Sequence, residues 1–195
     1  MVCDNGKAFI FLYPQPEIFK EELWGCGKDF ISRYKTALNR TIDERYRQKG
    51  FSINYAILDD CSVSGIIKLQ SGDSVLKVGM DSVTHRTPQE NGTYPYPNPD
   101  FILGQLGDIS VLRVGGFHVY SCCEKLAKRA HERGIDSLVD EELTQFFSMD
   151  FEKPNFRVDV YPSIDQRQFM GDGKRLKSFL EKRENRPWLW NWSSK

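Results

Sequence analysis

Apolar and polar positions along the first part of the chain follow patterns typical of buried strands and amphipathic helices. The compact apolar run Lys7–Tyr13 ends in a Pro-Gln-Pro turn, which predicts a buried strand. Apolar residues then recur at every fourth position between Asp29 and Gly50, which predicts a long helix capped by Asp29 and stopped by Gly50. The apolar run Phe51–Leu58 predicts the next strand.

The remaining chain continues this alternation and then changes character. Further strands are expected at 65–69, 74–80, 109–116 and 136–139, and a long loop at 84–100. Helices are expected at 99–107, at 119–133 and from Asp140 onward. The last of these begins with three acids, Asp140, Glu141 and Glu142, which is typical of helix capping. Strands that alternate with such helices predict an α/β fold, a three-layer sandwich with a mainly parallel central sheet. The irregular pattern after Asp150 predicts a core domain over residues 1–149 and a C-terminal appendage over 150–195, packed on the core or on a partner subunit.

Composition narrows the range of partners. The 195 residues are 39% hydrophobic, and 27 Lys and Arg balance 27 Asp and Glu, so no bulk positive charge is available to attract nucleic acid. No apolar run approaches the roughly 18 residues that span a bilayer, and the first residues do not form a signal peptide. The five cysteines lack CxxC and zinc-finger spacing. We therefore expect a cytoplasmic protein with no membrane or nucleic-acid partner, no metal and no cofactor.

The segment most suggestive of chemistry is Leu112–Gly134, where an apolar strand ends in two glycines and leads to Cys122 and Cys123 at the start of a helix. Ligands of such sheets bind beyond the carboxyl ends of the strands, and a helix N-terminus favours a thiolate. The two side chains lie about 100° apart on a helix, so only one can face a site. The alternative is that both are packing residues, because free cysteine is among the most buried residue types.

The spacing of this segment resembles that of isochorismatase-like cysteine hydrolases, which include nicotinamidases. In that family a glycine precedes the nucleophilic cysteine by six residues, and two alanines and a glycine follow it at set intervals. Gly116, Cys122, Ala127, Ala130 and Gly134 match this spacing. The resemblance covers about residues 7–147 and implies the fold, Cys122 as the nucleophile and Cys123 as its packing neighbour. The metal-binding histidines of nicotinamidases have no counterpart, since the three histidines are scattered.

The other members of the family's Asp–Lys–Cys triad are less well matched. Tyr13 stands at the aspartate position, with Gln15 in its usual place two residues later. A tyrosine with a pKa near 10 is a poor proton acceptor at neutral pH. Asp59 or Asp60, which follow the next strand, are candidate replacement bases, although two acids after a strand are also typical of a turn. Lys77 lies near the lysine position and is a candidate to lower the thiol pKa, with a solvated surface lysine as the alternative.

Four further residues are expected to surround a ligand. His118 precedes the helix and could contact a ligand or pair with the thiol of Cys122. Gly116 allows a sharp turn, and backbone N–H groups near Val119 are candidates to hold an oxyanion. Tyr96 lies in the proline-rich loop, which could form an aromatic wall, a lid or an ordinary surface loop. Tyr13 completes the expected substrate-binding set.

The sequence therefore predicts a cysteine hydrolase that acts on an amide or related carbon–nitrogen bond of a small molecule. The alternative is a catalytically silent protein of the same fold that binds a ligand or a protein partner. In that case the tryptophan-rich end could form an interface, including one between copies of this chain, through Trp188, Trp190 and Trp192. A third hypothesis, a nucleotide-binding module that uses residues 114–118 as its phosphate turn, lacks the GxGxxG spacing.

Overall fold

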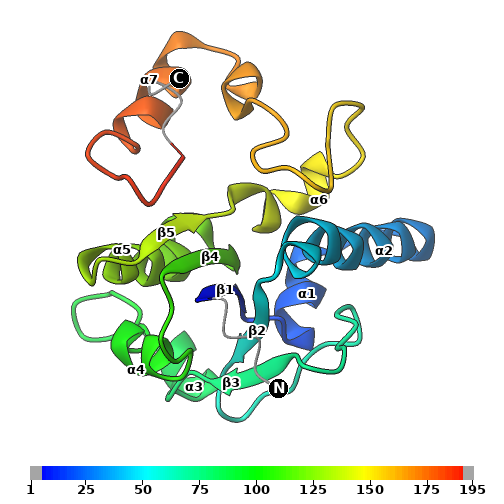
Figure 1. Ribbon diagram of the computed structural model, residues 1–195. Helices are drawn as coiled ribbons and strands as arrows, with labels where there is room; N and C mark the ends of the chain where they lie inside the picture. The colour runs from blue at the N-terminus through cyan, green and yellow to red at the C-terminus, as the bar shows by residue number, and fades with distance from the viewer. Residues whose placement is uncertain (1–5, 191–195) are drawn as a thin grey trace.

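The fold of the chain is a three-layer α/β sandwich, as the sequence predicted. The computed structural model describes residues 6–190 (Figure 1). Its centre is one sheet of five parallel strands in the order β3-β2-β1-β4-β5. The strands are β1 Lys7–Leu12, β2 Ser52–Ile57, β3 Ser74–Lys77, β4 Val111–Gly116 and β5 Asp136–Val139.

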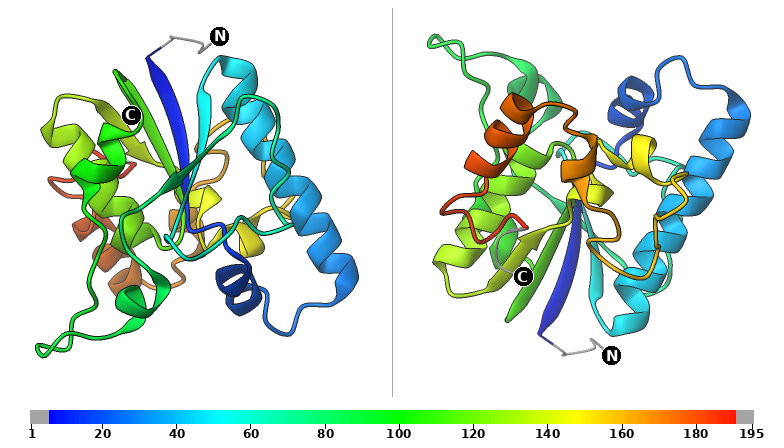
Figure 2. Two further views of the ribbon diagram at one scale, coloured as in Figure 1. Left: turned by 90° about the horizontal axis from the view of Figure 1, so that it is seen from below. Right: turned by 90° about the horizontal axis from the view of Figure 1, so that it is seen from above.

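Helices cover both faces of this sheet. The helices of the described residues are α1 Pro16–Glu22, α2 Lys28–Arg45, α3 Ser82–Arg86, α4 Pro99–Gly104, α5 Glu124–Glu132, α6 Phe147–Asp150 and, in the C-terminal part, α7 Gly173–Glu181. The two views of Figure 2 place α2 on one side of the sheet and α5 on the other. The crossovers between parallel strands require this arrangement, because each must pass over a face of the sheet.

The central strand β1 shows why both faces are covered. Ala8, Ile10 and Leu12 point to the layer that contains α5, whereas Phe9 and Phe11 point to the layer that contains α2. All five side chains are at most 1% exposed. The strand is therefore apolar without interruption, which is the pattern expected of a strand buried on both faces.

Two local expectations are wrong. No strand forms at residues 65–69, because the side chain of Asn39 on α2 bonds the carbonyl oxygen of Ile66 and the backbone N–H of Lys68. These backbone groups are therefore satisfied without a neighbouring strand. Helix α2 is capped by Gly27, not Asp29, and ends at Arg45 before a short 3₁₀ turn.

The helix expected at 119–133 is also divided. Residues 119–123 form an irregular turn in which Tyr120 and Ser121 have non-helical backbone angles, and regular helix begins only at Glu124. The turn places Cys122 and Cys123 before α5, not within its first turn. This difference alters what surrounds each thiol.

The acidic run after β5 does not act as a simple helix start. Asp140 caps a 3₁₀ turn by accepting a hydrogen bond from the N–H of Leu143, as expected of a capping residue. Glu141 and Glu142 are instead buried, at 2% and 0% exposure. Glu141 pairs with Arg183 of the appendage, and Glu142 pairs with Arg45 of α2. Capping therefore explains only one of the three acids.

The appendage, residues 150–190 in the described part of the chain, lies along the β5 side of the core (Figure 1). The carbonyl oxygen of Trp188 accepts a hydrogen bond of 2.9 Å from the N–H of Val139, at the outer edge of the sheet. The indole N–H of Trp188 donates to Glu124 at 3.1 Å, and the ring of Trp190 contacts Tyr161. The indole of Trp188 therefore contacts the core and that of Trp190 contacts the appendage itself, whereas Trp192 lies outside the described residues.

Burial of the two glutamates gives the appendage contact a pH dependence. Burial raises the pKa of Glu141 to about 7, against the pull of Arg183, and raises the pKa of Glu142 to about 7 with the help of nearby Asp140. Both values exceed the ordinary glutamate pKa of 4.5. The two protonated glutamates therefore contribute fully to the free energy of unfolding below about pH 4.5, and this contribution is lost as the pH rises through about 7.

We accordingly expect the free energy of unfolding to fall between about pH 5 and pH 8. Glu142→Gln removes one of the two titrating groups, so its curve over this window should be flatter than that of the parent chain. Urea unfolding at a series of pH values measures both slopes. Equal slopes for the parent and the variant would contradict this assignment.

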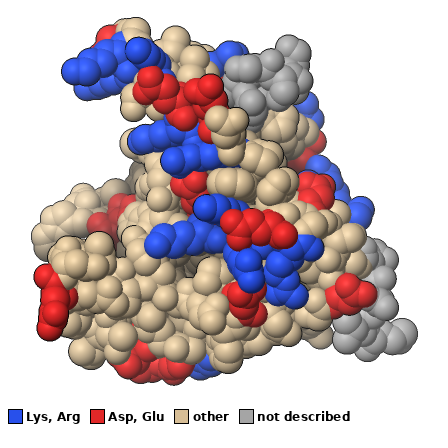
Figure 3. Space-filling model, turned by 90° about the vertical axis from the view of Figure 1, so that its left-hand side faces the viewer, with Lys and Arg blue, Asp and Glu red and all other residues tan. Residues whose placement is uncertain are grey.

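The outer face of α5 carries charges of both signs. Arg129 pairs with Asp100 of α4 at 2.9 Å, and Lys128 pairs with Glu132 one turn further along α5. Figure 3 shows Lys and Arg side chains beside Asp and Glu side chains on this side of the molecule. Such exposed pairs contribute little to stability, and they mix the charge on this face.

Candidate ligand-binding and active site

A cavity of about 460 Å³ lies where the carboxyl ends of three strands meet. Tyr13 follows β1, Leu58 follows β2 and Phe117 follows β4, and all three line it. Parallel α/β sheets bind their ligands at this edge. The rest of the wall comes from α1, α3, the proline-rich loop and the turn before α5: Gln15, Ile18, Glu21, His85, Arg86, Tyr94, Tyr96, His118, Ser121 and Cys122.

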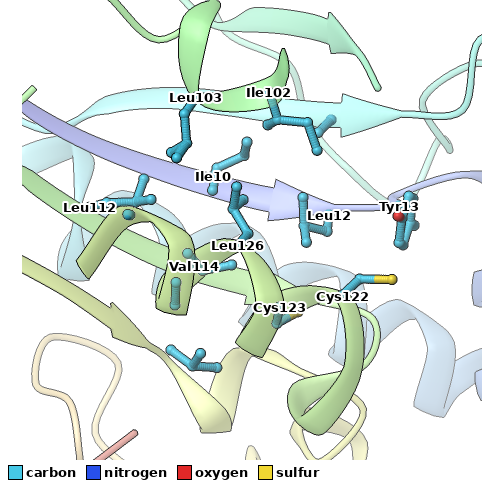
Figure 4. Packing of buried hydrophobic residues seen from close by; sticks show 14 of the residues in the cluster. Ile10, Leu12, Tyr13, Ile102, Leu103, Leu112, Val114, Cys122, Cys123 and Leu126 are labelled. Atoms are coloured by element: carbon cyan, nitrogen blue, oxygen red, sulfur yellow. The ribbon is translucent and has the colours of Figure 1, made fainter. Parts of the chain in front are cut away.

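The two adjacent cysteines face different surroundings. Cys122 lines the cavity and is 8% exposed, and its sulfur projects toward Tyr13 (Figure 4). Cys123 is fully buried in the core between the sheet and α5, where its thiol donates to the carbonyl oxygen of Gly115 at 3.4 Å. One thiol is thus in the cavity wall, and the other is a packing residue.

Tyr13 is the residue that the sequence resemblance aligned with the aspartate of isochorismatase-like hydrolases. Its backbone lies in the left-handed region at φ 59°, and its side chain is 3% exposed. The hydroxyl is within hydrogen-bonding reach of Cys122, and the ring meets His85 edge to face with centroids 5.0 Å apart. Burial, reinforced by the nearby thiol, raises the pKa of Tyr13 well above its ordinary value. The hydroxyl is therefore protonated at neutral pH and is no general base.

The thiol of Cys122 is not activated by its surroundings. Burial raises its pKa above the ordinary value, and this outweighs the opposing hydrogen bonds from Tyr13 and Ser121 and the positive charge of Lys125. The ammonium of Lys125 lies 3.4 Å from the centroid of the Tyr96 ring, a cation–π contact. The cation that acts on this thiol is therefore Lys125, whereas sequence reasoning selected Lys77.

Asp59, Asp60 and Lys77 do not line the cavity. Asp59 accepts a hydrogen bond from the N–H of Gly79, and the ammonium of Lys77 donates to two backbone carbonyl oxygens, those of Asp59 and Cys61. Asp60 accepts from both the N–H and the hydroxyl of Ser82, and these bonds lower its pKa. All three side chains stabilise the segments after β2 and β3, and for Asp59 and Asp60 this is the turn role that was their alternative.

Three of the expected ligand contacts, Tyr13, Tyr96 and His118, lie in the cavity wall. His118 places its ring against Glu22 of α1, with Nε2 3.1 Å from a carboxylate oxygen. The hydroxyl of Tyr96 accepts a hydrogen bond of 3.2 Å from Ser121, which joins the proline-rich loop to the turn before α5. The loop is thereby fixed beside Cys122 at the position of Tyr96.

Gly116 and Val119 shape the site without lining it. Gly116 has φ 101°, and a Cβ there would lie 2.1 Å from the carbonyl oxygen of Leu12, so no other residue fits. The N–H of Val119 donates to the side-chain oxygen of Gln145 at 3.0 Å. This N–H, which the sequence suggested as an oxyanion donor, is thus already occupied.

Gln15 is the feature of the site that sequence reasoning noticed but did not assign. It lies directly before α1, is 1% exposed and lines the cavity. Its side-chain oxygen has no hydrogen-bond partner among the described residues. Such an oxygen costs free energy until a donor reaches it. The only available signal was its place two residues after Tyr13.

The described residues offer no group of three His, Cys, Asp or Glu side chains that could hold a metal ion. No helix in the same part of the chain is long and apolar enough to cross a membrane.

Comparison with known proteins finds similarity in structure only. No protein-family model matches the sequence, and no curated protein matches it. Among solved structures, the pyrazinamidase of Pyrococcus horikoshii in complex with zinc is 10% identical, with 96% of this chain and 99% of that chain covered and a TM-score of 0.48. An isochorismatase family protein is 14% identical over 72% of this chain and 81% of its own, with a TM-score of 0.43. The MAR1 ribonuclease of Caenorhabditis elegans is 11% identical over 74% and 71%, with a TM-score of 0.44.

All three similarities are at low sequence identity, and all three TM-scores are below 0.5. No residue role is taken from them.

Proposed function

We propose that this protein binds a small aromatic molecule that carries an N–H donor, and that it holds this molecule without hydrolysing it. The observation that carries the proposal is that Gln15 lines the cavity while its buried side-chain oxygen has no hydrogen-bond partner among the described residues. An unsatisfied acceptor of this kind costs about 1–3 kcal/mol, which a ligand N–H would offset. The cavity volume, about 460 Å³, lies in the range of small-molecule sites.

The aromatic character of the ligand follows from the walls. Tyr13, Tyr94, Tyr96 and Phe117 surround the cavity, with the imidazole of His85 against Tyr13. Aromatic side chains pack best against other planar rings, in offset or edge-to-face arrangements. A flat ring with one N–H donor toward Gln15 satisfies both the apolar walls and the orphan acceptor.

The surroundings of Cys122 support binding without hydrolysis. A cysteine nucleophile needs a thiolate and a base, and here burial keeps the thiol protonated while its neighbour Tyr13 is itself a protonated hydroxyl. The nearby N–H of Val119 is bonded to Gln145, so it cannot hold an oxyanion as it stands.

A cysteine hydrolase that cleaves an amide or related carbon–nitrogen bond is the second candidate function. The position of Cys122 in the cavity wall, just before α5, favours it. In that mechanism Asp59 or Asp60 would serve as the base and Lys77 would lower the thiol pKa. Those three side chains would have to leave their present partners to reach the cavity.

Gln15→Leu tests the binding proposal, with benzamide as a probe that has a ring and an N–H donor. We expect the variant to bind benzamide about tenfold more weakly, which is the effect of losing one buried hydrogen bond. Methyl benzoate has the same ring but no donor, so its affinity should be unchanged. Ligand-observed NMR titration measures both. The free variant should also be more stable than the parent chain by about 1 kcal/mol, because an unsatisfied buried oxygen is gone.

The same samples separate the two candidate functions. Release of ammonia from benzamide by the parent chain, abolished in Cys122→Ser, would establish hydrolysis and overturn silent binding. Equal benzamide affinities for the parent and Gln15→Leu would contradict the role of Gln15.

A further inference from the structure

Trp24 is a large apolar side chain that the core does not use. It follows α1 and is 82% exposed, although the other described tryptophans, Trp188 and Trp190, are partly buried against the core. Its backbone is held in place by a hydrogen bond from its N–H to the carbonyl oxygen of Glu21. An indole held by ordered backbone but exposed to water offers a flat apolar surface to a ligand.

The surface beside Trp24 is hollowed and adjoins the inner cavity. A shallow hollow of about 610 Å³ is lined by Glu17, Lys20, Glu21, Trp24 and Arg86. Glu21 and Arg86 also line the inner cavity that holds Gln15. The two spaces therefore share one boundary, at which Arg86 of α3 pairs with Glu21 of α1 at 3.2 Å.

The boundary is a weak barrier. The side chains of Arg86 and Glu21 are 50% and 63% exposed. An ion pair this exposed contributes little, so either side chain can turn toward solvent at small cost. A linker between two groups of one ligand could then pass between α1 and α3, from the inner cavity to the hollow.

We propose that the inner cavity and the Trp24 hollow form one two-part site for an aromatic amide with a second planar ring. The inner ring and its N–H donor occupy the cavity at Gln15, and the second ring stacks on Trp24. This inference rests on the proposed function, because the inner ring is the molecule proposed there. It adds the length of the ligand and a second specificity-determining residue.

The charges of the hollow do not select a charged ligand. Glu17 and Glu21 are balanced by Lys20 and Arg86. An anionic or cationic linker would meet a like charge as well as an opposite one, so charge gives no net preference. Stacking on the indole is then the main source of affinity, and it requires only a flat ring.

Two probes that differ by one ring test this proposal. Benzamide fills the inner cavity alone, whereas 4-(benzyloxy)benzamide carries a second ring on a short neutral linker. We expect the two-ring probe to bind the parent chain about tenfold more tightly, the size of a good aromatic stacking contact. Trp24→Ala should remove this advantage and leave the affinity for benzamide unchanged. Because Trp24 is exposed, the variant should fold as the parent does.

A matched control is Phe101→Ala, which removes another exposed aromatic ring, 49% exposed, from α4 and away from both spaces. It should leave both affinities unchanged. Tryptophan fluorescence gives a direct readout, because the two-ring probe should quench the parent more than Trp24→Phe.

The outcomes separate the inference from the proposed function. Equal affinities of the parent chain for the two probes, with both weakened in Gln15→Leu, would overturn the outer part and leave the inner site standing. A two-ring probe that loses affinity in Trp24→Ala, when benzamide does not bind, would support the hollow and overturn the inner site. Failure of both probes to bind would overturn both.

Discussion

Iodoacetamide should alkylate Cys122 of the folded protein at least about tenfold more slowly than Cys26. Only the thiolate reacts, and burial raises the pKa of Cys122 above its ordinary value. The side chain is also only 8% exposed, whereas Cys26 is half-buried at the surface. Low thiolate content and restricted access thus act in the same direction. Peptide mass spectrometry after short labelling times at pH 8 measures each rate.

The matched control for this experiment is the unfolded chain. In concentrated guanidinium both cysteines should react at similar rates, because burial is the cause of the difference. Cys123, which is fully buried, should label later than Cys122 in the folded protein. Rapid labelling of Cys122 with an apparent pKa below about 8.5 would instead indicate an activated nucleophile and would revive the hydrolase hypothesis.

Arg45→Met should lower the free energy of unfolding by about 3–5 kcal/mol, the range for removing one partner of a buried ion pair. Arg45 is 3% exposed and lies 3.0 Å from carboxylate oxygens of both Asp140 and Glu142. It also donates to the carbonyl oxygen of Arg157 at 2.7 Å, so it joins α2 to the appendage. Methionine keeps the length of the side chain but leaves two carboxylates buried without their cation.

Urea unfolding at pH 8, where Glu142 is largely ionised, measures this loss. Arg40→Met is the control on the same helix, because Arg40 is exposed and its pair with Glu44 lies at the surface. That substitution should change stability little. Similar losses for the two variants would mean that the buried network does not anchor the appendage.

The sequence located the cavity cysteine of the candidate site better than it located the residues expected to act on that cysteine. The resemblance to isochorismatase-like hydrolases selected Cys122 over Cys123, and the structure places Cys122 in the cavity wall. The proposed partners of that thiol came from positions along the chain, and position does not fix where a side chain points. Asp60 follows one predicted strand and Lys77 lies within the next, but their polar atoms bind Ser82 and backbone carbonyl oxygens.

Local periodicity was sufficient for the layers of this protein. The apolar run that became β1 and the four-residue repeat that became α2 each specify an element by which faces they bury. Element ends depended on tertiary contacts. Asn39, for example, bonds the segment 66–68 and so prevents the strand expected there.

The sequence by itself thus determined the parallel sheet, its helical layers and the edge at which a site lies, because these follow from short-range patterns of burial. Only the tertiary structure decided the chemistry. Glu141 pairs with Arg183, the N–H of Val119 donates to Gln145, and the side-chain oxygen of Gln15 has no partner among the described residues. These three outcomes depend on residues that are far apart in the chain. The packing of those residues sets which polar groups are satisfied and which remain available to a ligand.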